Sequence, residues 1–186
     1  MPARLLGVVS RRGDREIPPV CRARSRHNRR VTRDTDLDRL LLRRATSDDA
    51  RAVAEIWLAS FDDALPTVRR PHDDDHVRGW IRDHLVAEAD TWVAVRGGRT
   101  AAVLTLAPGW IEQLYVAPSH QGVGIGSLLV EHAKARAGDQ LQLWTFQVNA
   151  RARAFYRRHG FHEVELTDGA TNMEREPDVR LVWTRA

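Results

Sequence analysis

The sequence predicts an α/β protein of the α+β kind, with a mixed central sheet of about six to seven strands flanked by about four helices. Three observations support this fold class. Apolar residues follow a period near two in some segments and near 3.6 in others, which predicts strands alternating with helices. Gly97-Gly98 joins two strand-like segments in the manner of a tight hairpin. Residues 110–127 have the pattern of a buried strand, a glycine-rich turn and a helix start.

The individual elements can be placed in order along the chain. Short apolar, β-prone runs predict strands at residues 40–44, 91–96, 100–106, 110–116, 140–146, 162–165 and 179–184. Apolar residues at helical spacing predict helices at about residues 46–61, 73–85, 125–133 and 150–159. Asp48 and Asp49 suit the first turn of the first helix. Asn149 suits the N-cap of the last helix, and Gly160 suits the left-handed position after it. A long polar loop, residues 167–177, separates the last two strands.

The composition favours one globular domain in a reducing compartment. A chain of 186 residues suits a single domain. Its one cysteine, Cys21, cannot form an intrachain disulfide. Because no apolar run approaches the roughly 18 residues that cross a membrane, we expect no membrane partner. These features predict a cytoplasmic protein.

Positive charge gathers near the N-terminus. Residues 1–40 contain 11 arginines and 5 acidic residues, although the whole chain has a net charge of only +4. Residues 1–38 have too few apolar groups to offset the entropy of ordering, so we expect a disordered Arg-rich extension before a domain at residues 39–186. The extension could bind nucleic acid, form a passive tail or come from a start codon assigned too early. It has no aromatic residue for base stacking, which argues against a nucleic-acid partner.

A glycine-rich turn follows the strand at residues 110–116. Gly122, Gly124 and Gly126 occupy every second position, just before the predicted helix. The first N–H groups of a helix lack internal partners and carry partial positive charge, and glycines let a phosphate approach the backbone. We therefore expect a pyrophosphate on the N–H groups of residues 122–127. The spacing fits neither a P-loop nor a G-x-G-x-x-G dinucleotide fingerprint.

Two motifs resemble signatures of the GNAT superfamily of N-acetyltransferases. Residues 121–126 have the pattern Gln-x-x-Gly-x-Gly, which is similar to the pyrophosphate loop of that family. Residues 149–161, NARARAFYRRHGF, resemble its second signature, N-x(5)-FY-x(3)-GF. The likeness covers about residues 40–186. It implies the GNAT fold and an N-acetyltransferase that moves an acetyl group from acetyl-CoA to a primary amine by direct attack on the thioester.

The resemblance also implies where acetyl-CoA, the co-substrate, would bind. The strand at residues 110–116 would splay from the next strand, its backbone would pair with the pantetheine arm, and one N–H would polarise the acetyl carbonyl. Trp144 and the end of its strand would form the other wall. The residues expected to bind acetyl-CoA are Leu114, Tyr115, Val116, Gln121, Gly122, Val123, Gly124, Ile125, Gly126, Ser127 and Asn149.

Tyr156 and Glu112 are the catalytic candidates. The family's tyrosine at the position of Tyr156 points at the sulfur, and a phenol can protonate a departing thiolate. The alternative for Tyr156 is a core aromatic residue beside Phe155. Many family members carry a general base at the position of Glu112, which should share a strand face with Leu114. The alternatives are an acid exposed at a strand end, or an amine that deprotonates without a dedicated base.

The acceptor pocket implied by the resemblance lies between the first helices and the last loop. Acids in this region would favour a cationic amine of a small molecule or a peptide. They are Asp62, Asp63, Asp73, Asp74, Asp75, Asp168, Glu174 and Glu176. His72 and His76 have a spacing seen in metal sites, but one histidine pair is weak support, so we expect no metal. Adjacent Ser119 and His120 are not expected to form a nucleophile–base pair, because adjacent residues rarely face each other. His132 and His159 are expected to lie on helices as partly buried structural residues.

Two further points stay open at this stage. A module of the same fold that binds acetyl-CoA and senses it without turnover is the alternative function. The edge strands of this fold often pair, so a homodimer is a second open question.

Overall fold

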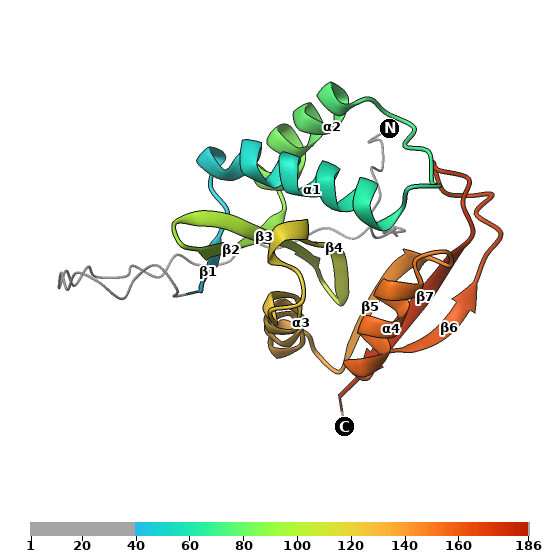
Figure 1. Ribbon diagram of the computed structural model, residues 1–186. Helices are drawn as coiled ribbons and strands as arrows, with labels where there is room; N and C mark the ends of the chain where they lie inside the picture. Colours follow the sequence, from blue (N-terminus) through green and yellow to red (C-terminus); the bar gives the residue numbers. More distant parts are fainter. Residues whose placement is uncertain (1–39, 186) are drawn as a thin grey trace.

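The chain forms one mixed seven-stranded sheet with helices on both faces (Figure 1). The computed structural model describes residues 40–185. The strands are β1 (Leu41–Arg44), β2 (Asp90–Arg96), β3 (Arg99–Ala107), β4 (Trp110–Val116), β5 (Gln140–Phe146), β6 (His162–Leu166) and β7 (Asp178–Thr184). They lie in the order β1-β2-β3-β4-β5-β7-β6. The predicted fold class is confirmed, and each predicted strand is present with ends within one residue.

The helices also follow the prediction, with one change in hydrogen bonding. They are η2 (Ser47–Asp49), α1 (Ala50–Ala64), α2 (Asp74–Trp80), η3 (Ile81–Val86), η4 (Pro118–His120), α3 (Ile125–Arg136) and α4 (Ala150–Arg158). η2 and η4 are 3₁₀ helices, whereas η3 is a π-helix. The second predicted helix is therefore α2 followed by a π-helical turn. No helix among residues 40–185 is long and apolar enough to span a membrane.

The sheet parts at its centre. Every neighbouring pair of strands is antiparallel except β4 and β5, which are parallel. These two strands pair at a single position, Trp110 opposite Gln142, and the N–H of Gln142 also donates to the carbonyl of Gly109 at 2.9 Å. Beyond this point the strands diverge toward their C-terminal ends. The splay implied by the resemblance is present, and it leaves backbone groups of β4 facing away from β3 available to a ligand.

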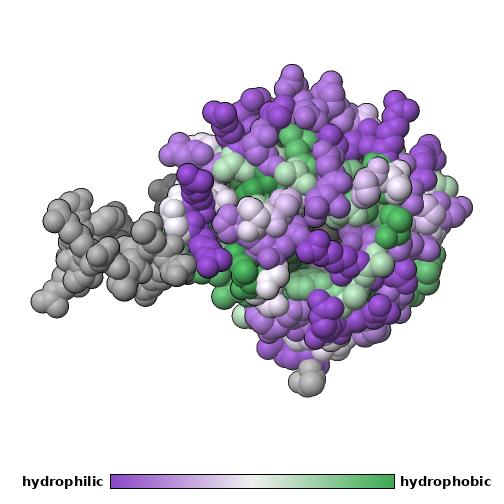
Figure 2. Space-filling model, viewed as in Figure 1, coloured by the Kyte–Doolittle hydropathy of each residue, from purple (hydrophilic) through white to green (hydrophobic). Residues whose placement is uncertain are grey.

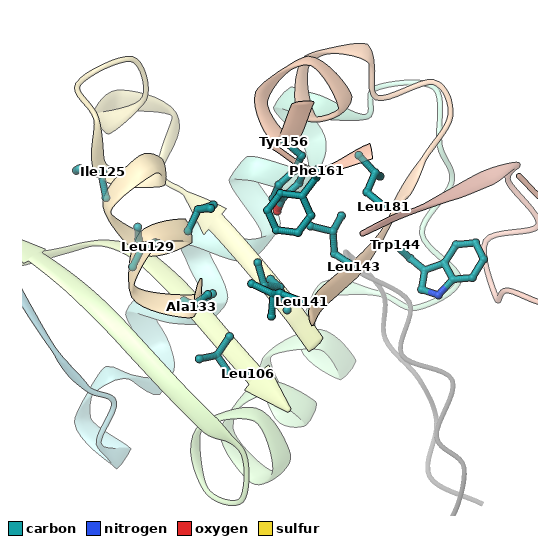
Figure 3. Close-up of a cluster of buried hydrophobic side chains, with 14 of the residues drawn as sticks. Leu106, Ile125, Leu129, Ala133, Leu141, Leu143, Trp144, Tyr156, Phe161 and Leu181 are labelled. Atoms are coloured by element: carbon teal, nitrogen blue, oxygen red, sulfur yellow. The ribbon is translucent and has the colours of Figure 1, made fainter. Parts of the chain in front are cut away.

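Two buried clusters cover the opposite faces of the sheet. The first lies beneath α3 and α4 and includes Leu129 and Tyr156 (Figure 3). The second lies beneath α1 and α2 and includes Trp57 and Tyr115. β4 contributes to both clusters, since Leu114 packs against the first. Successive side chains of a strand point to opposite faces, so β4 can present side chains to both sides of the central parting.

The extension predicted for residues 1–38 lies outside the described residues, as does the single cysteine.

Candidate functional site

A cavity of about 460 Å³ lies where β4 and β5 part. It is bounded by these two strands, the end of α1, the glycine-rich turn, α3 and α4. Figure 2, drawn from the same side as Figure 1, shows hydrophobic residues set among hydrophilic ones on this face. The expected site residues that line the cavity are Leu114, Tyr115, Val116, Gln121, Gly122, Gly124, Gly126, Ser127, Asn149 and Tyr156.

Three expected site residues do not line this cavity. Val123 is 57% exposed at the tip of the turn, and Ile125 is buried in the core. Their side chains therefore do not contribute to its wall, although their backbone belongs to the turn. Glu112 is half-buried and lies outside the lining.

The glycines of the turn have different physical roles. Gly122 and Gly124 have φ angles of 78° and 91°, in the left-handed region that L side chains rarely adopt. Gly124 is also the N-cap of α3 and has no side chain to cap the helix. The first N–H groups of α3 are thus left to an external acceptor, as expected for a pyrophosphate site.

Gly126 allows α3 and α4 to approach each other. A Cβ atom at this position would lie 3.2 Å from Cζ of Phe155 and 3.8 Å from a methyl carbon of Val116. Its φ angle is ordinary, so the lack of a side chain matters for space and not for backbone conformation. This packing explains the third glycine of the motif and places α4 beside the start of α3.

Ser127 lies at the N-terminus of α3 and is linked to α4. Its Oγ lies 3.0 Å from Nε2 of His159, whose Nδ1 lies 3.4 Å from a carboxylate oxygen of Glu131. The sequence reading placed His159 on a helix as a partly buried structural residue and missed this contact. No periodic pattern could have shown it, since Ser127 and His159 are 32 residues apart.

The carbonyl of Val116 anchors the end of β4 to its surroundings. It accepts a hydrogen bond from Oγ of Ser60 at 3.0 Å and another from Nε2 of Gln121 at 3.1 Å. Gln121 therefore ties the glycine-rich turn back to β4 and lines the cavity at the same time. The Asn149 side chain caps α4 by accepting from the N–H of Ala152 at 3.0 Å, as predicted.

Two tyrosines, Tyr156 and Tyr115, contribute to the wall of the cavity. Both line it, and both are largely buried. Burial raises the pKa of the Tyr156 phenol above its ordinary value, so this group stays protonated at physiological pH. Burial also raises the pKa of Tyr115, with smaller contributions from Glu174 and Tyr156. The two phenols are therefore close enough to interact electrostatically.

Glu112 occupies a β-bulge in β4. Thr105 of β3 pairs with Gln113, and the next residue, Leu106, pairs with Ile111, so Glu112 has no partner on β3. The expected simple alternation with Leu114 is interrupted at this point. A bulge cannot be read from β4 alone, because it depends on how β3 aligns with it.

Thr145, near the end of β5, forms the β5 wall of the cavity, whereas Trp144 does not line it. Trp144 is buried in the first core cluster, and in Figure 3 its ring lies apart from the labelled rings of Tyr156 and Phe161. The expectation for Trp144 was wrong because neighbouring strand residues point to opposite faces, so an error of one residue exchanges the two walls.

Two arginines that the sequence reading missed also line the cavity. Arg151 and Arg158 are seven residues apart on α4 and so share a helix face. Arg151 also lies 3.6 Å from the carboxylate of Asp63 on α1, which links the two helices. Their charges favour an anionic ligand. The full set of lining residues that had not been expected is Ser60, Ala64, Leu65, His120, Arg151, Ala152, Phe155 and Arg158.

His72 and His76, whose spacing is seen in metal sites, lie against each other. The rings of His72 and His76 stack with their centroids 4.0 Å apart and nearly parallel. In the described part of the chain, no group of three or more His, Cys, Asp or Glu side chains is placed to hold a metal ion. The expectation that the adjacent side chains of Ser119 and His120 do not face each other was wrong. Oγ of Ser119 lies 3.0 Å from Nδ1 of His120.

A parted strand pair, a glycine-rich helix start and a buried tyrosine beside the parting define an acyltransferase of the kind that uses acyl-CoA. The sequence profile of the acetyltransferase (GNAT) family matches residues 50–161. The chain belongs to this family.

Relatives and solved structures agree with this assignment. The chain is 29% identical over 126 residues to the peptidyl-lysine N-acetyltransferase YiaC of Escherichia coli strain K12, covering 67% of this chain and 85% of YiaC. The solution structure of apo-form YjaB from Escherichia coli has a TM-score of 0.68 at 24% identity, covering 79% of this chain and 99% of YjaB. The PaiA N-acetyltransferase of Thermoplasma acidophilum, solved in complex with coenzyme A, has a TM-score of 0.60 at 16% identity, covering 79% of this chain and 99% of PaiA.

Proposed function

We propose that this N-acetyltransferase moves the acetyl group of acetyl-CoA to the side-chain amine of lysine in a peptide or protein. One observation carries the proposal: the uncapped start of α3 and the phenol of Tyr156 face the same cavity, beside the parting of β4 and β5. The choice of lysine is supported by YiaC, whose name describes a peptidyl-lysine N-acetyltransferase.

The lining residues fit acetyl-CoA as the co-substrate. The N–H groups at the start of α3 would bind its pyrophosphate, with support from Ser127 and from the cationic Arg151 and Arg158. The unpaired side of β4 near Leu114 and Tyr115 offers backbone groups to the amides of the pantetheine arm. A backbone N–H in this row would polarise the thioester carbonyl.

Tyr156 would act as the general acid. Its raised pKa keeps the phenol protonated, so Oη–H is present to donate to the thiolate as the carbon–sulfur bond breaks. Glu112 remains the base that the sequence predicts, but the β-bulge at this position interrupts the alternation that would place it on the same strand face as Leu114. A cytoplasmic location also remains a prediction. The non-catalytic sensor is not favoured, because a sensor needs no acid at the position of Tyr156.

Thiol release from acetyl-CoA in the presence of lysine-containing peptides tests the proposal. We expect wild-type turnover with such peptides, a loss of about 10²-fold or more in kcat for Tyr156→Phe, and an unchanged affinity of that variant for acetyl-CoA. The matched control uses the same peptides with lysine replaced by norleucine, which should not be acetylated at that position. Absence of turnover with every lysine peptide would overturn the acceptor class, and full activity of Tyr156→Phe would overturn the assignment of the acid.

A further inference from the structure

Two buried polar atoms, one of them on a residue that lines the cavity, are left without hydrogen-bond partners among the described residues. Within residues 40–185, neither Oη of Tyr115 nor Oε2 of Glu174 has a partner. An unpaired buried polar atom costs roughly 1–3 kcal/mol, so such atoms tend to mark places where a ligand or water completes the site. Both atoms can accept a hydrogen bond, and they are therefore suited to a group that carries several donors.

The strand ends bring Glu174 toward Tyr115. Asp178, at the start of β7, pairs with Phe146, at the end of β5. Phe146 packs in the second buried cluster together with Tyr115. The loop that carries Glu174 ends at Asp178, and the carboxyl of Glu174 lies close enough to Tyr115 to raise the pKa of its phenol. Tyr115 thus interacts electrostatically with both Glu174 and Tyr156.

The loop between β6 and β7 is held by its own hydrogen bonds. The side chain of Asn172 donates to the carbonyl of Glu176 at 2.7 Å and to the carboxylate of Asp178 at 3.2 Å, and it accepts from the N–H of Glu176 at 3.2 Å. The loop packs closely enough that a Cβ at Gly169 would lie 2.4 Å from the backbone of Glu176. A loop ordered in this way can hold a carboxyl group in a fixed position.

Glu174 differs from the acids of α1 and of the start of α2 that were expected in the acceptor pocket. Arg70 forms ion pairs with Asp62 and Asp74 at 3.3 and 2.8 Å. Asp73 caps α2 by accepting from the N–H of His76 at 2.8 Å. These carboxylates already have structural partners.

No arginine or lysine in the described part of the chain forms an ion pair with Glu174. Burial raises the pKa of its carboxyl to about 7; Asp178 adds to this rise and the backbone amide of Glu174 opposes it. A carboxyl with this pKa is about half ionised at neutral pH, which suits proton uptake.

We propose that the Glu174 carboxylate and the Tyr115 hydroxyl bind the ammonium group of the acceptor, and that Glu174 then removes its proton. The inference rests on the proposed function and assigns the base to Glu174 in place of Glu112. The acceptor is accordingly a primary amine that arrives as a cation, as a lysine side chain does.

The proton balance of the reaction can be followed from these groups. One N–H proton of R–NH₃⁺ moves to the carboxylate of Glu174, which gives R–NH₂ and a neutral carboxyl. The nitrogen lone pair attacks the acetyl carbon, the carbon–nitrogen bond forms and the carbon–sulfur bond breaks. The departing thiolate takes the proton of Tyr156, and the second nitrogen proton restores that phenol. Glu174 returns its proton to solvent.

Steady-state kinetics of Glu174→Gln test the proposal. Glutamine keeps the size and one acceptor oxygen but cannot take up the proton. We expect kcat/KM for a lysine peptide at pH 7.5 to fall by about 10²-fold or more, with acetyl-CoA affinity within about twofold of wild type. Tyr115→Phe should raise KM for the peptide by about threefold to tenfold. Glu88→Gln, at an exposed position after η3, is the matched control and should stay within about twofold of wild type in both measurements.

The pH profile distinguishes the two candidate bases. In the wild type, kcat/KM should rise as the pH increases through about 7, because the proton acceptor is the ionised form. This rise of kcat/KM with pH should disappear in Glu174→Gln and persist in Glu112→Gln. The proposal is overturned if Glu174→Gln retains wild-type activity, or if Glu112→Gln alone abolishes the rise of kcat/KM with pH.

A measurement without an acceptor keeps this inference separate from the proposed function. Carbon-13 NMR of the glutamate carboxyl groups, with Glu174 identified by the signal lost in Glu174→Gln, should give a titration midpoint near 7. A midpoint near 4.5 would overturn the role of Glu174 whatever the acceptor is. Failure of every lysine peptide in the turnover assay, together with a midpoint near 7, would instead count against the acceptor class alone.

Discussion

Oγ of Ser127 and Nε2 of His159 lie 3.0 Å apart and join the start of α3 to the end of α4. His159 is in turn 3.4 Å from Glu131, one turn further along α3. The contact fixes the direction of a hydroxyl at the place where the first N–H groups of α3 face the cavity. The proposed pyrophosphate site therefore depends on the packing of two helices as well as on the glycine-rich turn.

Ser127→Ala should weaken the binding of coenzyme A by about threefold to tenfold, the effect of one lost hydrogen bond. His159→Gln should produce a smaller loss, because it acts only through the orientation of the Ser127 hydroxyl. Isothermal titration calorimetry with coenzyme A measures both changes. His162→Gln, on an exposed position of β6, is the control. Equal affinity of Ser127→Ala and wild type would refute a role for the hydroxyl.

Gly126→Ala should destabilise the fold by about 1–2 kcal/mol, because the new methyl group would lie 3.2 Å from the ring of Phe155. The higher helix propensity of alanine offsets part of this loss. Urea unfolding measures the change, and Gly138→Ala, which has open space around its Cβ, is the control. Adding Phe155→Leu to Gly126→Ala should remove the steric penalty. A penalty that persists in the double variant would contradict the role of Phe155.

Glu174→Gln should make the protein more stable at pH 8 but not at pH 4. The pKa of Glu174 is raised to about 7 from an ordinary value near 4.5, so the folded state favours the protonated form. Ionisation of Glu174 in the wild type therefore reduces stability progressively as the pH rises from about 4.5 to 7, and the reduction is complete above 7. The gain at pH 8 should be roughly 1–2 kcal/mol after solvent screening is considered. Thermal unfolding at both pH values measures it, and a difference that does not change with pH would contradict the assigned cause.

Asp49→Asn should destabilise the start of α1 by about 1–3 kcal/mol at pH 7. The carboxylate of Asp49 accepts two hydrogen bonds from Arg43, at 2.7 and 2.9 Å, and one from the N–H of Thr46 at 2.8 Å. The Arg43 hydrogen bonds are the main cause that lowers the pKa of Asp49 to about 2. This stabilisation is present above the ordinary pKa near 3.8 and is lost as the pH falls toward 2.

Urea unfolding at pH 7 and at pH 3 provides the test for Asp49. The difference between wild type and Asp49→Asn should become smaller at the lower pH. The neighbouring Asp48 is exposed, so Asp48→Asn should change stability by less than about 0.5 kcal/mol at either pH. A similar loss in both variants would show that the effect is not specific to the Arg43 contact.

Features that repeat locally could be predicted from the sequence. Alternating apolar residues and turn residues located the strands to within one residue, because both signals lie within the segment itself. The backbone freedom of Gly122 and Gly124 could be read from the sequence, because the left-handed conformation that both adopt is a property of single glycine residues. The cap at Asn149 was predicted for the same reason, since its partner is only three residues away.

Features that depend on distant partners could not be predicted. The bulge at Glu112 comes from the alignment of β3 with β4, and the roles of Thr145 and Trp144 depend on which face of β5 each residue occupies. Asp62 and Asp63 looked like acceptor-site acids until their arginine partners were placed beside them. The π-helical turn at residues 81–86 has the same apolar spacing as an α-helix over so short a length.

The parting of β4 from β5 has a consequence for the lifetime of the protein. The ladder between the two halves of the sheet is reduced to one residue pair, Trp110 with Gln142, so the halves share little backbone bonding. An extended ligand with amide groups, lying along β4, would fasten them together and shift the balance away from the opened states that proteases attack. The persistence of the enzyme would then follow the supply of its acyl donor, without any separate regulatory domain.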